Sequence, residues 1–119
     1  KELWRKVEQK YLPFKDYDDD SFLEKGTFWF RQGHIFSVPF YYIDYTLAQV
    51  VAFQYWIKAQ DNSKEAFAHY LALCKLGGSK GFVDLLKSAN LENPFNSGTV
   101  SKTLEPLKAF LNSIDDTKL

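Results

Sequence analysis

Apolar residues recur along this chain at the three- and four-residue spacing that is typical of helices. No segment shows a sustained alternation of apolar and polar residues, which is the pattern of a half-buried strand. The spacing predicts helices over about residues 2–11, 22–33, 39–60, 64–76, 80–89 and 99–114. We therefore expect an all-α fold with short connections, in which residues 1–119 form a single helical unit.

The segment from about Pro39 to Gln60 is the most apolar of these predicted helices. Its apolar residues fall on most sides of a helix and are Ile43, Leu47, Val50, Val51, Phe53, Trp56 and Ile57. A helix that is apolar on most sides lies at the centre of a fold. Pro39 suits the first helical turn, where its missing N–H has no intrahelical partner to lose. The preceding "HIFSVP" is then a short connection.

Several residues indicate how the other helices begin and pack. Ser21 with Glu24 has the spacing of a capping box, and Asn62 stands three residues before Glu65 in the same way. Gly26 falls inside the predicted helix 22–33, which indicates that another backbone approaches closely at that point.

Composition narrows the classes of function. The chain has 15 basic and 15 acidic residues and no stripe of Lys and Arg, which disfavours nucleic acid as a partner. The longest apolar run, "VVAF", is far too short to span a bilayer, so no membrane partner is expected. Cys74 is the only cysteine, which fits a reducing compartment such as the cytoplasm.

The first residues, from Lys1, are already in helical register, and the sequence contains no Met. We therefore expect a piece of a longer protein, with an apolar helix face left uncovered near its start. Exposed apolar surface of this kind predicts self-association of the isolated chain.

No complete metal or catalytic motif is visible. The two histidines, His34 and His69, are not part of an H-E-x-x-H sequence, so we expect no metal ligands and no bound cofactor in this chain. The aspartates of residues 16–20 alternate as calcium ligands do. However, Ser21 and Thr27 stand where a calcium loop needs Gly and Glu, so helix initiation is the favoured interpretation.

The stretch "GHIFSVPFYYIDY", residues 33–45, contains most of the candidate functional side chains. On the predicted helix, Tyr42 and Tyr45 are three residues apart and Tyr41 and Tyr45 are four apart, so they share one face near its N-terminus. His34 lies just before them. Tyrosine hydroxyls stay protonated near pH 7 and can donate to an oxygen that gains negative charge. They could equally fill a core, with each hydroxyl bonded to backbone.

The longer stretch "FWFRQGHIFSVPFYYIDYTLAQVVAFQYW" resembles the C-terminal part of the oligoendopeptidase F group, which belongs to the M3 (thimet oligopeptidase-like) zinc metallopeptidases. The run "CKLGGSKGFVDLLKSANLE" is similar to the next segment of that group, and the resemblance extends from about Leu3 to Ile114. It implies an almost wholly helical catalytic domain with a deep channel that holds zinc. The H-E-x-x-H helix and the downstream Glu that bind the zinc would lie upstream of Lys1.

The resemblance also implies roles for the residues of this stretch. In the family, this region supplies a histidine and tyrosines that contact the peptide backbone and the oxyanion of the tetrahedral intermediate. His34 matches the motif's histidine, while Tyr42 and Tyr45 match its Y-x-x-Y pair. We therefore expect Tyr45 and His34 to be catalytic, and His34, Tyr42 and Tyr45 to bind substrate. Tyr41 is a further substrate-binding candidate without a firm counterpart, because the spacing differs among branches of the family.

Taken together, these features predict the C-terminal part of a cytoplasmic zinc oligoendopeptidase that hydrolyses short peptides. Its partners would be the oligopeptide substrate and the remainder of the catalytic domain, and the chain alone would be inactive. One alternative is a free-standing helical module that binds a peptide or protein through the tyrosine cluster. Another is a relative that keeps the fold and has lost the zinc ligands. An H-E-x-x-H motif upstream in the same reading frame would distinguish these possibilities.

Overall fold

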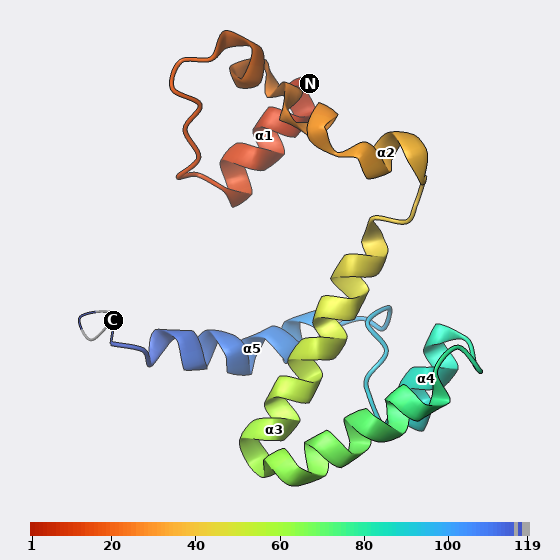
Figure 1. Cartoon of the computed structure of the whole chain (residues 1–119). Coiled ribbons are helices and arrows are strands. Elements are labelled where there is room, and N and C mark those ends of the chain that lie inside the picture. The colour runs from red at the N-terminus through yellow and green to blue at the C-terminus, as the bar shows by residue number, and fades with distance from the viewer. Residues whose placement is uncertain (116, 118–119) are drawn as a thin grey trace. The chain divides into compact units, whose positions relative to one another are not determined.

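The computed structural model describes residues 1–115 and 117, and within them it contains helices and turns but no strand, which confirms the all-α prediction. The elements are α1 (Glu2–Tyr11), η1 (Leu23–Thr27), η2 (Phe28–Arg31), α2 (Gly33–Ser37), α3 (Ile43–Leu76), α4 (Phe82–Ser88) and α5 (Thr99–Asn112) (Figure 1). The chain divides into two compact units, Lys1–Tyr42 and Ile43–Leu119. That residues 1–119 form one helical unit stays a prediction.

The first unit is organised around a buried carboxylate, that of Glu8 in α1, which is 5% exposed. Oε1 of Glu8 accepts hydrogen bonds from the Tyr17 hydroxyl at 2.6 Å, from Lys15 Nζ at 3.0 Å and from Trp4 Nε1 at 3.3 Å. Oε2 accepts one from Arg5 Nη1 at 3.2 Å. A buried charge is tolerated only when it is paired and hydrogen-bonded, so these donors are what allow Glu8 to lie inside. They also fasten the loop after α1 to the helix.

Cations and aromatic rings pack around the same carboxylate. Lys15 Nζ lies 3.3 Å from the centroid of the Phe28 ring, and the guanidinium of Arg5 lies 5.1 Å from that of Tyr17. The Tyr17 and Phe28 rings are themselves 5.9 Å apart. Because ring faces attract cations, these contacts hold Lys15 and Arg5 in place while they neutralise Glu8.

The prediction of one regular helix over residues 22–33 is wrong. The chain forms a π-helical turn, η1, then a 3₁₀ turn, η2, and only after Gln32 an α-helical turn, α2. The cause is Gly26, whose φ of 76° is left-handed and interrupts the helix. A Cβ at this position would overlap the carbonyl oxygen of Lys1 and lie 3.0 Å from Cβ of Arg5. The close backbone approach predicted at Gly26 is therefore present, and the contact is with α1.

The capping box expected at Ser21 and Glu24 is also wrong. Oδ1 of Asp20 accepts hydrogen bonds from the backbone N–H groups of Phe22 at 2.9 Å and Leu23 at 3.0 Å, so Asp20 caps this segment. Glu24 instead pairs with Arg5 Nη2 at 2.6 Å. The competing partner explains why Glu24 does not turn back toward Ser21.

The second unit is built on α3, which is one long element with a break. Asn62 has φ −151° and ψ 91°, outside the helical region, and the bend is visible along α3 in Figure 1. Asn62 Oδ1 accepts a hydrogen bond from the Glu65 N–H at 3.2 Å, and Asn62 Nδ2 donates to Glu65 Oε2 at 3.1 Å. This reciprocal pair confirms the predicted cap and restarts the helix after the break.

A small apolar core joins α3 to α4 and to the segment after it. Leu86, Ala89 and Leu91 are buried, and Val51, Tyr55 and Leu73 of α3 pack against them. Gln54, which is 8% exposed, fastens the same segment through both ends of its amide. Its Nε2 donates to the Glu92 carbonyl at 3.0 Å, and its Oε1 accepts from the Glu92 N–H at 2.8 Å.

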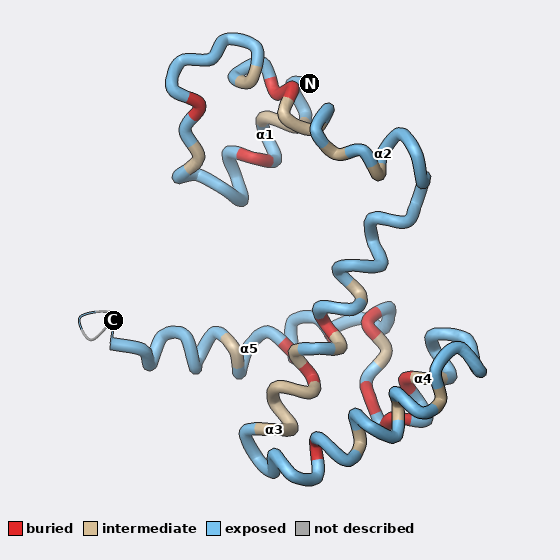
Figure 2. The backbone as a smooth tube through the Cα atoms, in the orientation of Figure 1, coloured by how far each residue is buried: buried red, intermediate tan, exposed pale blue. Residues whose placement is uncertain are grey.

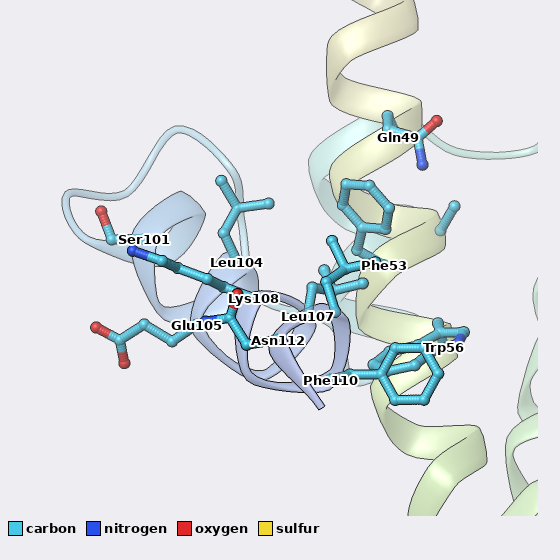
Figure 3. Close-up of a pocket in the computed structure, with 12 residues that line it drawn as sticks. Gln49, Phe53, Trp56, Ser101, Leu104, Glu105, Leu107, Lys108, Phe110 and Asn112 are labelled. Atoms are coloured by element: carbon cyan, nitrogen blue, oxygen red, sulfur yellow. The ribbon is translucent and has the colours of Figure 1, made fainter. Parts of the chain in front are cut away.

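Helix α5 packs on the first half of α3 and leaves a groove of about 830 Å³ between them (Figure 3). The Trp56 and Phe110 rings meet across it, with their centroids 5.0 Å apart.

Buried positions are sparse along the chain (Figure 2), and side chains as large as Leu3, Phe14 and Phe40 are 75%, 82% and 96% exposed. Within residues 1–115 and 117, no helix is long and apolar enough to span a bilayer.

Acid should weaken the first unit through Glu8. Burial raises the pKa of Glu8, but hydrogen bonds from Tyr17, Lys15 and Arg5 outweigh burial and lower the pKa below its ordinary value of 4.5. A carboxylate with a lowered folded-state pKa stabilises the fold above its unfolded pKa, and this contribution is lost as the pH falls through the folded pKa. We expect the free energy of unfolding, measured with urea and tryptophan fluorescence, to fall below about pH 4.5.

The variant Glu8→Gln should lose about 2–3 kcal/mol at pH 7, because the cations around it lose their counter-charge. Its stability should then depend less on pH in the acid range. Glu24→Gln is the matched control, since its carboxylate is exposed and such pairs contribute less than about 1 kcal/mol. Equal acid sensitivity in Glu8→Gln and the unmodified chain would contradict this role.

Gly26→Ala should destabilise the first unit by roughly 2–4 kcal/mol, because a left-handed φ and a backbone overlap act together. Gly33→Ala is the control in the same unit, since nothing lies within 4 Å of a Cβ at that helical position. It should be neutral or stabilising by up to about 1 kcal/mol. Equal unfolding free energies for the two variants would show that the contact at Lys1 does not matter.

Candidate functional site

A tight turn shapes the candidate site. The short helix α2 ends with a hydrogen bond from the Val38 N–H to the His34 carbonyl at 3.1 Å, and the Tyr41 N–H then donates to the Val38 carbonyl at 3.2 Å. Pro39 occupies the second position of this turn, and Phe40 occupies the third with a φ of 65°. Pro at the second position and a positive φ at the third are features of a type II turn. The turn reverses the chain so that it passes back by α2.

Phe40 is an unusual residue for this conformation. A left-handed backbone costs a residue with a side chain about 1–2 kcal/mol, and glycine usually occupies such positions. The Phe40 side chain is 96% exposed, so packing within the chain does not offset that cost. Backbone strain of this kind concentrates at functional sites.

The turn brings three of the predicted site residues together in the first unit. The rings of His34 and Tyr42 have their centroids 5.1 Å apart and are tilted, while those of His34 and Tyr41 are 6.1 Å apart and stacked. His34 is half-buried, whereas Tyr41 and Tyr42 are 46% and 49% exposed. The arrangement therefore offers an imidazole and two accessible phenol hydroxyls, all of them groups that can donate hydrogen bonds.

Tyr45 lies in the second unit, in the first turn of α3, and is 54% exposed. The prediction that the three tyrosines share one helix face is wrong. Helix α3 begins only at Ile43, so Tyr41 and Tyr42 lie before the helix. The sequence predicted that His34 lies in a loop, but it lies in the short helix α2. The turn at Phe40 is the physical reason why the tyrosines do not share a helix, since a positive φ cannot be part of a right-handed helix.

The residues that the structure describes do not fit a metal site. Among them, no group of three or more His, Cys, Asp or Glu side chains could hold a metal ion. His69 lies 4.0 Å from Glu65, one helical turn earlier, and no third ligand joins them. In the acidic run, Asp16 Oδ1 accepts the Asp18 N–H at 3.0 Å and Asp20 caps η1, so two of these carboxylates serve local backbone structure.

Known structures contain this fold as a segment of a larger protein. No protein-family model and no curated protein matches the chain. A solved structure named oligoendopeptidase F matches with 53% identity and a TM-score of 0.90, covering 100% of this chain and 21% of its own. A structure of PZ peptidase A with an inhibitor matches with 52% identity and a TM-score of 0.87, covering 98% of this chain and 21% of its own.

An oligoendopeptidase F from Bacillus anthracis matches with 44% identity and a TM-score of 0.70, covering 98% of this chain and 17% of its own. The chain thus spans about a fifth of the length of these structures. All three are peptidases, so the chain has the fold of one segment of a larger peptidase. In particular, it matches a fragment of oligoendopeptidase F, which confirms the resemblance seen in the sequence.

Proposed function

We propose that this chain is the C-terminal part of an M3-type zinc oligoendopeptidase, a cytoplasmic enzyme that hydrolyses short peptides. The observation that carries the proposal is the match over 98–100% of the chain, at 44–53% identity, to three peptidase structures. The remainder of the catalytic domain and an oligopeptide substrate are the implied partners.

In this proposal, His34, Tyr42 and Tyr45 bind the peptide backbone, and Tyr41 is a further contact. The half-exposed phenols beside His34 support it, because they combine a fixed position with access for a ligand. Attack on a peptide carbonyl places negative charge on its oxygen. A donor that is already oriented toward that oxygen stabilises the transition state more than the ground state. We assign this donation to Tyr45 and His34.

Zinc is the cofactor that the proposal implies for the complete enzyme, where it would supply the activation of water for hydrolysis. We place its ligands outside this chain, since the histidines His34 and His69 are not part of an H-E-x-x-H sequence. The chain's own contribution is then to orient the peptide and to donate to the developing oxyanion. The isolated chain should be inactive, and its exposed apolar side chains predict that it self-associates.

Tyr45→Phe in the complete enzyme should lower kcat by about 10²–10³-fold with little change in KM, because only a transition-state hydrogen bond is removed. Tyr11→Phe is the control, since Tyr11 is an exposed tyrosine at the end of α1, and it should leave both constants unchanged. Steady-state kinetics on a fluorogenic peptide provides the measurement. An unchanged kcat in Tyr45→Phe would exclude the oxyanion role.

His34→Ala should lower kcat/KM by about 10²-fold, through the loss of a positioned donor and of the ring that packs on Tyr42. His69→Ala is matched to it, because His69 is the chain's other half-exposed histidine, and it should retain full activity. Equal activity in the two variants would remove His34 from the site. A complete protein that cleaves no peptide would instead favour the binding-module alternative.

A further inference from the structure

A second groove lies within the second unit, where the first turns of α3 face the start of α4. Its volume is about 640 Å³, and the residues that line it are Asp44, Leu47, Ala48, Gly81, Phe82, Val83, Asp84 and Phe95. Asp44 immediately precedes Tyr45 in the first turn of α3. The groove therefore includes the residue that precedes, in the sequence, the tyrosine assigned to the oxyanion, although Tyr45 itself does not line it.

The walls of this groove are apolar and open. The Phe82 and Phe95 rings meet edge to face, with centroids 6.4 Å apart, and these side chains are 38% and 62% exposed. Leu47 and Ala48 of α3 line the groove as well. These surfaces can pack along the methylene groups of a long side chain.

The polar groups that line the groove carry negative charge. Asp84 pairs with Lys87 at 3.1 Å, so its charge is partly compensated. Within the part of the chain that the structure describes, the Asp44 carboxylate has neither a hydrogen bond nor an ion pair. The groove thus combines apolar walls with one carboxylate that makes no ion pair among the described residues, and no basic residue lines it.

We propose that this groove binds the side chain of a basic residue, Lys or Arg, in the peptide substrate. The inference rests on the proposed function and specifies part of the substrate. Lys and Arg place a cation at the end of an apolar stem, which matches apolar walls with a carboxylate beside them. The phenylalanine faces add attraction for the cation. A peptide held at Tyr45 has neighbouring side chains within reach, because successive residues of an extended peptide are only about 3.3–3.6 Å apart.

The test uses the complete enzyme and a set of peptides. In each peptide, a single Lys or its uncharged analogue norleucine occupies one position near the cleaved bond, and kcat/KM is measured for each pair. We expect the unmodified enzyme to favour Lys at one position. Asp44→Asn should lower kcat/KM for that Lys peptide by roughly three- to tenfold and leave the norleucine peptide unchanged. Glu105→Gln, which removes a carboxylate on α5 outside this groove, should change neither.

A second variant tests the apolar wall separately from the charge. Phe95→Ala should lower kcat/KM for the Lys and norleucine peptides alike, because both use the same stem contact. Equal rates for Lys and norleucine at every position, or equal losses for both in Asp44→Asn, would overturn the inference while leaving the peptidase assignment intact. An unmodified enzyme that cleaves none of the peptides would overturn the proposed function itself, and the inference with it.

Discussion

The hydrogen bond from the Tyr41 N–H to the Val38 carbonyl closes the turn on which the candidate site depends. It fixes Pro39 and Phe40 at the corner, returns Tyr41 and Tyr42 to the ring of His34, and delays the start of α3 to Ile43. A continuous helix from Pro39 would instead have placed the tyrosines on one helix face. The strained Phe40 is the cost of the compact arrangement.

Local capping chemistry predicted some features correctly. The Asn62 and Glu65 pair follows from two side chains three residues apart. The close approach at Gly26 follows from a glycine inside a helical pattern, although the pattern does not reveal that the approaching backbone is that of Lys1. The turn at Phe40 did not follow, because Phe carries no signal for a left-handed φ and Pro39 suits a helix start equally well. The Ser21 cap failed for another reason, since Glu24 found a tertiary partner in Arg5 that the local pattern does not reveal.

In helix α1 the charged face is buried and the apolar face is exposed, which is the opposite of the usual arrangement in an amphipathic helix. Its apolar positions Leu3, Val7 and Tyr11 are 75%, 47% and 68% exposed, while Glu8 is buried. Periodicity finds the apolar face but cannot tell which face this part of the chain covers. The cations that neutralise Glu8 come from the same helix and from the loop after it, so the polar face packs inward. The uncovered apolar face is then surface available to the missing four fifths of the proposed enzyme.

Residues that bind no metal can still influence how fast an enzyme acts and which substrates it accepts. Hydrogen bonds made more strongly in the transition state raise kcat, while contacts made equally in both states change only KM. Tyr45 and His34 are proposed for the first kind of interaction, and the groove beside Asp44 for binding that also positions the substrate. Because Asp44 and Tyr45 belong to the same turn of α3, the helix start that orients one also orients the other. Selectivity and rate would then be coupled through a single rigid element, so a peptide seated by its basic side chain would also have its carbonyl aligned.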